Sequence, residues 1–280
     1  MTSIFLGPAG IPTVAEDRST LGGIRKVAEL KLNAMEIEFV RKVYLSEKAA
    51  EEAGKLAEEF GVKLSVHAPY FLNLCSSKKQ TVEASKNFIL DSMERAQAMK
   101  AEVVVAHLAY YSGLTPEKAY EIVKEEVKDI VEKAKERGIK DVLLGGETTG
   151  KVSQFGTVEE LVKLSKEVKG CTIVLDPAHI FARNAGKIDY SKMLDEVEKL
   201  KLKYLHMHFS GIKFTQVKAT GFGNEKEHIP MNNSPPFEPL AKEILKRKLN
   251  VTIISESPIL EQDSLKMKRV FESLGYKFKV

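Results

Sequence analysis

The chain of 280 residues contains no tryptophan and only two cysteines, Cys75 and Cys171. Two cysteines so far apart exclude a disulfide framework and a cysteine-based zinc site, so any metal must be bound by histidine and carboxylate side chains. No uncharged stretch reaches the roughly 20 apolar residues that a membrane-spanning helix needs, so we expect no membrane partner. The N-terminus lacks the basic and then apolar pattern of a secretory signal, and we therefore expect a cytoplasmic protein.

The excess of positive charge is also small, because 43 Lys and Arg residues stand against 39 Asp and Glu residues. Such a balance neither requires nor excludes a nucleic-acid partner. The hydrophobic share of 43% rules out general disorder and allows a sizeable core. We expect residues 1–280 to form a single domain, because no Pro- or Ser-rich linker and no break in composition divides the chain.

Short β-branched runs alternate with longer amphipathic stretches along the chain. We expect eight strands, each followed by a loop and a helical pattern, at Ile4–Gly7, Met35–Val40, Leu64–His67, Val103–His107, Val142–Glu147, Ile173–Asp176, Tyr204–Phe209 and Val251–Glu256. Ser46 and Thr115 suit helix starts, and Gly61 and Gly138 suit helix ends. Eight such units in this length match an α/β fold of the (β/α)8 TIM-barrel type.

The active site of such a barrel lies at the carboxyl ends of its strands, and these ends carry metal-binding residue types. They are, in chain order, His67, His107, Glu147, Asp176 followed by His179, His208 and Glu256. His228 lies in the longest loop, about Gly211 to Asn233, which we expect to fold over the barrel mouth. Burying several imidazoles and carboxylates without partners would be costly, whereas divalent cations neutralise them. The sequence therefore predicts a centre with more than one metal ion, which suits phosphate-ester hydrolysis.

Four motifs resemble those of endonuclease IV, a family of xylose isomerase-like barrels. They read His67-Ala68-Pro69-Tyr70-Phe71-Leu72-Asn73-Leu74, Glu147-Thr148-Thr149-Gly150-Lys151, Leu175-Asp176-Pro177-Ala178-His179 and Met207-His208-Phe209. The resemblance runs from about residue 30 to 260. It implies a deoxyribonuclease of base excision repair that cuts double-stranded DNA on the 5′ side of abasic sites with three clustered zinc ions. We expect a monomer, with Mn²⁺ as the alternative metal.

Carried over by motif, the resemblance implies the ligands of each zinc ion. His67, His107 and Glu147 would hold the first, Glu147, Asp176, His208 and Glu256 the second, and His179 and His228 the third. Glu147 would also be catalytic, by orienting the attacking water.

One position departs from the family pattern. The Asp-x-His of the family aligns on Lys226-Glu227-His228, so Lys226 stands where the aspartate ligand is expected, and two or three zinc ions follow. Glu225 and Glu227 are the candidates to replace the aspartate, although in an extended strand Glu227 points away from the face of His228.

The resemblance also implies residues that contact DNA. Tyr70 and Phe71 are placed to wedge into the base stack, and Arg41 and Lys42 to contact the minor groove. For the two aromatic residues the alternative is packing at the barrel rim. Basic residues in other mouth-side loops are placed to meet phosphates, namely Lys78, Lys79, Lys151, Arg183, Lys187 and Lys213.

Three further polar residues fit the nuclease less well. Glu36 and Glu38 alternate with apolar residues and should point into the barrel, and His206 lies two residues below His208 on the same face. They form either a hydrogen-bond network that supports the ligands or a polar pocket for a small hydroxylated substrate, as in the sugar isomerases and epimerases that share this barrel and use one or two divalent metals. The remaining four histidines favour the nuclease, because an isomerase does not need all of them. A non-catalytic protein that binds damaged DNA is the third class.

Overall fold

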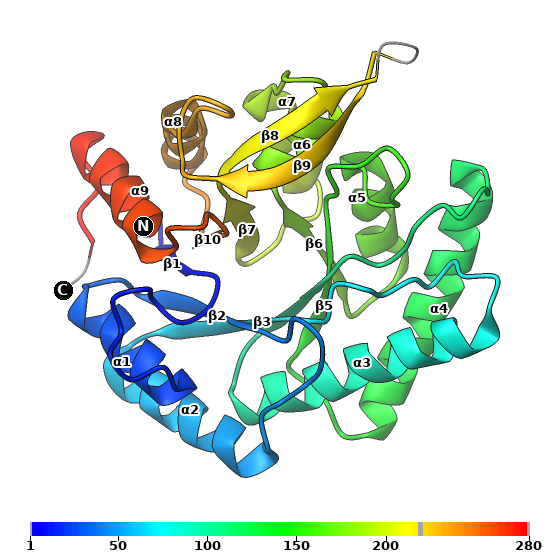
Figure 1. Cartoon of the computed structure of the whole chain (residues 1–280), viewed down its shortest axis with the longest axis horizontal. Helices are drawn as coiled ribbons and strands as arrows, with labels where there is room; N and C mark the ends of the chain where they lie inside the picture. The colour runs from blue at the N-terminus through cyan, green and yellow to red at the C-terminus, as the bar shows by residue number, and fades with distance from the viewer. Residues whose placement is uncertain (1, 218–220, 279–280) are drawn as a thin grey trace.

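A computed structural model, which describes residues 2–217 and 221–278, shows a barrel of eight parallel strands surrounded by helices (Figure 1). The strands are β1 (Ile4–Pro8), β2 (Ala34–Glu38), β3 (Lys63–His67), β4 (Val103–Ala106), β5 (Leu143–Glu147), β6 (Cys171–Leu175), β7 (Leu205–Phe209) and β10 (Val251–Ser255). Their order in the sheet is β1-β10-β7-β6-β5-β4-β3-β2. The predicted (β/α)8 TIM barrel is confirmed.

The barrel closes between β1 and β2 through one isolated bridge. Ala9 pairs with Glu36, and the amide of Gly10 donates to the carbonyl of Glu36 at 2.9 Å. The two strands approach closely below this bridge, where a Cβ atom on Gly7 would lie only 1.6 Å from the carbonyl oxygen of Ala34. Glycine at position 7 is therefore a requirement of the closed barrel.

Nine helices of the described residues surround the barrel. They are α1 (Thr20–Glu29), α2 (Glu47–Phe60), α3 (Lys79–Ala98), α4 (Pro116–Glu136), α5 (Val158–Glu167), α6 (Pro177–Arg183), α7 (Tyr190–Glu198), α8 (Phe237–Arg247) and α9 (Glu261–Ser273). The predicted signals act as expected, since the side chains of Ser46 and Thr115 cap α2 and α4, and Gly61 ends α2 at φ 67°. Gly138 follows α4 at φ 77°.

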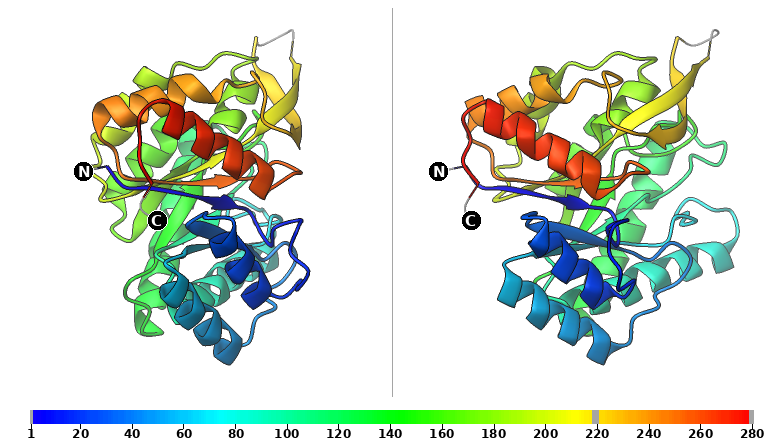
Figure 2. Two further views of the ribbon diagram at one scale, coloured as in Figure 1. Left: turned by 90° about the vertical axis from the view of Figure 1, so that its left-hand side faces the viewer. Right: turned by 60° about the vertical axis from the view of Figure 1, so that its left-hand side comes forward.

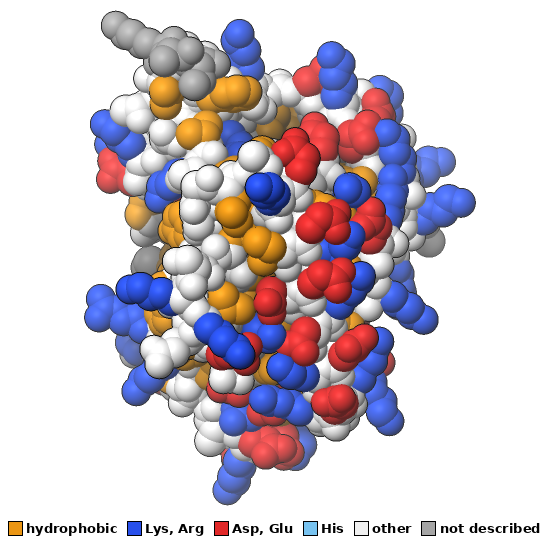
Figure 3. Space-filling view, turned by 90° about the vertical axis from the view of Figure 1, so that its right-hand side faces the viewer, with side chains coloured by type: hydrophobic (Ala, Val, Ile, Leu, Met, Phe, Trp, Pro, Cys, Tyr) orange, Lys and Arg blue, Asp and Glu red, His pale blue; other side chains and the backbone are white. Residues whose placement is uncertain are grey.

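The outer surface of the helices is charged. On the flank seen in Figure 3, Lys and Arg side chains stand among Asp and Glu side chains. Beneath this surface, the buried Lys86 joins α3 to α4 through Glu126 at 2.7 Å and Asp129 at 2.5 Å. None of the helices within the described ranges is long and apolar enough to cross a membrane.

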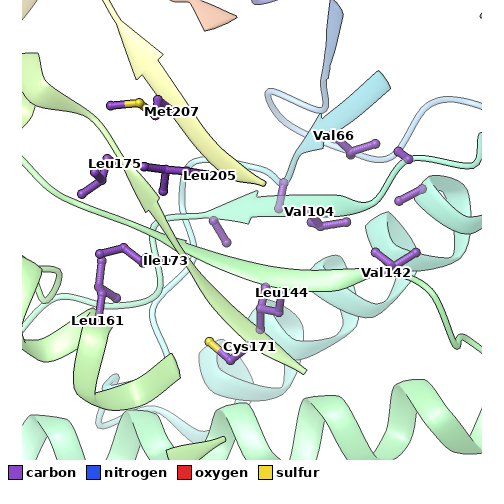
Figure 4. Close-up of a cluster of buried hydrophobic side chains, with 14 of the residues drawn as sticks. Val66, Val104, Val142, Leu144, Leu161, Cys171, Ile173, Leu175, Leu205 and Met207 are labelled. Carbon is purple, nitrogen blue, oxygen red and sulfur yellow. The ribbon is translucent and has the colours of Figure 1, made fainter. Parts of the chain in front are cut away.

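The main hydrophobic core lies between the barrel and the helices (Figure 4). Outward-facing residues from neighbouring strands fill it, among them Val66, Val104, Leu144, Ile173 and Met207. The opposite faces of the strands point into the barrel, where Val103, Val105 and Val174 form a separate cluster. The same alternation turns His206 and His208 inward.

The long loop after β7 contains a hairpin that the sequence analysis did not predict. β8 (Gly211–Gln216) and β9 (Gly223–Ile229) pair antiparallel and project beyond the carboxyl ends of the barrel strands (Figure 2). The segment does reach the mouth, where Nε2 of His228 lies 3.2 Å from Nε2 of His179, but much of it is strand and not irregular loop.

A β-bulge interrupts the hairpin. Lys213 pairs with Glu227, but the next residue, Phe214, pairs with Glu225, so Lys226 is an extra residue without a partner position. A bulge of this kind shifts the alternation of side chains by one residue.

Candidate metal centre

Glu147, the buried last residue of β5, lies at the middle of a cluster that contains all eight predicted ligand residues. Its Oε2 atom lies 3.2 Å from Nε2 of His67 and 2.9 Å from Nε2 of His107. Its Oε1 atom lies 3.1 Å from Nδ1 of His208 and 3.3 Å from Nδ1 of His179. Burial opposes a charge on Glu147, but the charges of His107 and His208 hold its pKa well below the ordinary value.

The potential ligand atoms at the mouth form three overlapping groups, in each of which all atoms lie within 4.8 Å of one another. The groups are His67, His107 and Glu147; Glu147, Asp176, His208 and Glu256; and Asp176, His179, His228 and Glu256. The first two have the members that the motifs predict, and the third adds two carboxylates to the expected histidines. Because neighbouring groups share residues, the arrangement is one continuous centre.

Anchored imidazoles present their free nitrogens to this centre. His67 and His179 donate from Nδ1 to the carbonyls of Ala68 and Thr148, at 2.6 and 2.9 Å. A carbonyl oxygen only accepts, so Nδ1 carries the hydrogen and the neutral ring keeps its lone pair on Nε2. Burial disfavours a charge on His67, yet the contact with Glu147 raises its pKa to about 9. A cation at this position would compete with that proton.

Asp176 supplies a direct indication that a cation fits. It caps α6, and its Oδ1 accepts from the amide of His179 at 2.9 Å. Its buried Oδ2 atom has no hydrogen-bond partner among the described residues, and burial raises the pKa of this carboxyl. A buried carboxylate oxygen without a partner costs free energy that a divalent cation would remove. The buried His, Asp and Glu side chains therefore suit divalent metal ions.

A polar layer supports the centre from inside the barrel. Glu36 is fully buried, and its Oε2 atom accepts from Ser65 at 2.7 Å and contacts Nε2 of His206 at 3.0 Å. Its Oε1 atom lies 2.8 Å from Nε2 of His208, whose Nδ1 faces Glu147. The sequence placed Glu36 and His206 inside the barrel, and the structure joins them in one network that reaches His208.

The residues predicted to contact DNA lie on exposed loops of the mouth. Phe71 is 52% exposed, Tyr70 is 42% exposed, and Arg41 and Lys42 follow β2 on the surface. The hydroxyl of Tyr70 donates to Glu38 at 2.6 Å, so this ring also forms part of the wall of the centre. Phe71 also packs at the rim, with its ring 5.2 Å from that of Phe88, so both aromatic residues combine exposure with packing.

Arg183, which we expected to meet phosphates, is committed elsewhere. Its Nη1 atom donates to the carbonyls of Lys151 and Gln154 at 2.7 and 2.9 Å and to the hydroxyl of Thr149 at 3.0 Å. Its guanidinium holds the loop after β5 against α6, and contact with phosphate stays a prediction for this residue.

The two glutamates that could replace the missing aspartate differ in where their side chains lie. Oε2 of Glu225 lies 3.2 Å from Nε2 of His179. Glu227 points away from the centre, and its side chain, 59% exposed, pairs with Lys213 at 2.7 Å. Strand alternation alone does not predict that Glu225 faces the centre.

The fold and this centre can be set beside known proteins. A family model described as xylose isomerase-like TIM barrel matches residues 24–274. The chain belongs to this family. An uncharacterized protein of Methanocaldococcus jannaschii is 32% identical over 280 residues, which cover 97% of this chain and 98% of that protein. A probable endonuclease 4 of Mycoplasma mobile is 26% identical over 250 residues, 84% of each chain.

Solved structures of xylose isomerase-like barrels show the same fold. Endonuclease IV from Thermus thermophilus superposes with a TM-score of 0.69 at 22% identity, over 95% of this chain and 98% of that one. A D-psicose 3-epimerase gives a TM-score of 0.65 at 16% identity, over 95% and 96% of the two chains. The chain is a metal-binding enzyme of this family. Probable endonuclease 4 proteins are its distant relatives in sequence, and the D-psicose 3-epimerase shares its fold.

Proposed function

We propose that this xylose isomerase-like barrel is a metal-dependent phosphodiesterase that cuts DNA on the 5′ side of abasic sites. One observation carries the proposal, namely that histidines flank the central carboxylates on both sides. His67 and His107 lie on one side of Glu147, and His179 and His228 extend the centre on the other. A sugar isomerase with one or two metals does not need four flanking imidazoles, whereas a nuclease with three clustered metals does.

The proposed cofactors are zinc ions, with manganese as the alternative. Imidazole and carboxylate ligands suit zinc, and two groups that share Glu147 would hold two neighbouring ions. Bound there, the ions would provide a nucleophile at neutral pH and offset charge that develops on the phosphate. Glu147 reaches both groups with its two oxygens, so this residue would fix their spacing and orient the attacking water.

The proposed partner is double-stranded DNA that contains an abasic site, bound by a monomer. Phe71 and Tyr70 stand exposed beside the first group of ligands, with the rings of Tyr70 and His67 4.7 Å apart. Aromatic side chains in this position can replace the stacking of an extruded nucleotide. Arg41 and Lys42 on the neighbouring loop would contact the sugar-phosphate backbone.

The test is cleavage of an end-labelled duplex with one synthetic abasic site by zinc-loaded protein. We expect a single nick on the 5′ side, no nick in an undamaged duplex, and loss of cleavage in His67→Ala. Binding of the damaged duplex without a nick would instead assign the chain to the non-catalytic damage-binding class. If protein with confirmed metal content neither binds nor cleaves the damaged duplex, the proposal is refuted.

A sugar epimerase is the second candidate, and the polar groups on β2 favour it. Glu38 lies at the mouth end of β2, and burial raises the pKa of its carboxyl to about 7, a value suited to proton transfer near neutral pH. Ketohexoses in deuterated water provide the test, because epimerisation would introduce deuterium at the inverted carbon.

A further inference from the structure

The bulge at Lys226 decides which side chains of β9 face the metal centre. Without it, Glu225 and His228 would lie on opposite faces, because they are three residues apart in a strand. With Lys226 as an extra residue, Glu225 pairs with Phe214 and His228 with Ile212. Phe214 and Ile212 both pack against α6, so the inward face of the hairpin carries Glu225 and His228 together.

The neighbouring segment leaves room for the Glu225 side chain. A Cβ atom on Gly150 would lie 2.0 Å from Oε2 of Glu225 and 2.9 Å from its Cβ atom, so only glycine at position 150 permits this conformation. The amide of Glu225 also donates to the carbonyl of Gly150 at 3.0 Å, and Asn224 pairs with Lys151. These contacts hold β9 beside the loop after β5 and fix the place where the carboxylate enters the centre.

Two potential ligand atoms lie close to Nε2 of His179 at this place. Nε2 of His179 lies 3.2 Å from Nε2 of His228 and 3.2 Å from Oε2 of Glu225. His179 uses Nδ1 to donate to the carbonyl of Thr148, and Nδ1 of His228 lies 2.6 Å from the hydroxyl of Ser210. With Nδ1 of each ring engaged in this way, Nε2 of His228 and Oε2 of Glu225 are the two neighbours of Nε2 of His179.

A cation beside Nε2 of His179 could bind both of its neighbours at once, whereas a proton on that atom points at only one of them. Oε2 of Glu225 is buried and has no hydrogen-bond partner among the residues that the structure describes. The side chain as a whole is only 15% exposed, so water offers little compensation. Two imidazole nitrogens and one carboxylate oxygen form a ligand set that suits zinc.

We infer that Glu225 is a metal ligand and binds a third ion together with His179 and His228. With the bulged Lys226 set aside, Glu225, Glu227 and His228 reproduce a carboxylate-x-His spacing on one face of the strand. Lys226 therefore does not occupy the position of the missing aspartate, and the missing carboxylate is supplied from one residue earlier. The inference deepens the proposed metal centre, but it does not depend on cleavage of DNA.

The experiment counts zinc ions per chain by mass spectrometry of the metal content, after dialysis against a zinc buffer that saturates the wild type. We expect three ions in the wild type and two in Glu225→Gln, because the amide lacks the negative charge that holds the third ion. Glu227→Gln is the matched control, since it removes the same charge two residues away on the outer face, and it should keep three. Affinity for the third ion should fall about tenfold or more in Glu225→Gln, since even an indirect partner of a ligand contributes about 10- to 100-fold.

A second variant leaves Glu225 itself intact. Gly150→Ala places a methyl group where the carboxylate lies, and it should also lose the third ion while circular dichroism stays unchanged. Three ions in a folded Glu225→Gln variant, only two in the wild type, or loss of an ion in Glu227→Gln would each overturn the inference. If the wild type holds three ions, Glu225→Gln holds two and abasic DNA stays uncut by the wild type, the proposed function is refuted and Glu225 is still a ligand.

Discussion

The clearest single test of the inner polar layer is the substitution Glu36→Gln. The carboxylate of Glu36 contacts three partners, Ser65 and His206 through one oxygen and His208 through the other. An amide has only one acceptor oxygen. In one orientation its NH2 group faces Ser65 and His206, and in the other it faces Nε2 of His208.

The expected magnitude follows from the contact with His208. If His208 binds metal through Nδ1, the partner of its Nε2 atom fixes the tautomer and the orientation of the ring. Loss of such a partner lowers metal affinity about 10- to 100-fold, which corresponds to about 1.4 to 2.7 kcal/mol. We also expect the free energy of unfolding of the metal-free protein to fall by about 1 to 3 kcal/mol, because a buried donor loses its acceptor.

The assay is competition for zinc with a chromophoric chelator, together with urea unfolding in the presence of a strong chelator. Ser65→Ala is the matched control, since it removes one hydrogen bond to Glu36 and leaves the contact with His208 in place. It should cost about 0.5 to 1.5 kcal/mol of stability without a change in zinc affinity. Glu36→Ala removes both oxygens, and if it bound zinc as tightly as the wild type, the reasoning about His208 would be wrong.

Three further predictions concern the rim, the mouth and the seam of the barrel. Phe71→Ala should weaken binding to an abasic duplex by about 1 to 3 kcal/mol in a fluorescence anisotropy titration. Phe60→Ala, which changes a similarly exposed residue at the other end of the barrel, should leave the affinity unchanged. Equal losses of affinity in the two variants would show that Phe71 is not part of the DNA interface. Burial raises the pKa of Glu38 to about 7 from its ordinary value of 4.5. Between these two pH values the carboxyl takes up a proton on folding, so the contribution of Glu38 to the free energy of unfolding falls as pH rises. Glu38→Gln removes this pH-dependent loss of stability, so the melting temperature of the metal-free variant should rise relative to wild type between about pH 5 and 8. Parallel curves of melting temperature against pH for the two proteins would contradict the raised pKa of Glu38. Gly7→Ala should destabilise the protein by about 3 kcal/mol or more in urea, because its methyl group would overlap the carbonyl of Ala34, and a neutral result would mean that the seam can widen at little cost.

Much of the centre could be predicted because parallel strands in a barrel all end at the same mouth. His67, Glu147 and His208 are the last or nearly the last residues of three strands, and this position alone brings them together. The hydrophobic alternation of the strands made these positions visible in the sequence.

The hairpin could not be predicted in the same way. β9 reads Gly-Asn-Glu-Lys-Glu-His-Ile, and most of its residues are polar and not β-branched, so neither composition nor alternation indicates a strand. The sequence does not indicate the bulge either, so simple alternation places Glu225 and His228 on opposite faces of the strand, whereas the bulge places them on the same face. The contacts of Arg183 likewise depend on carbonyl groups that the sequence does not place.

The bridge that closes the barrel also links folding to cofactor binding. The backbone of Glu36 joins β2 to β1 through Ala9 and Gly10, while its side chain supports His208. Asn33, directly before β2, also holds the seam, since its amide donates to the carbonyl of Leu6 at 3.1 Å. Local opening at the mouth end of the seam would withdraw Glu36 from His208. Bound metal should therefore slow hydrogen exchange at the amide of Gly10, although that amide follows β1 and contacts none of the ligands. Exchange at this amide would then report whether the seam between β1 and β2 opens less often when metal is bound.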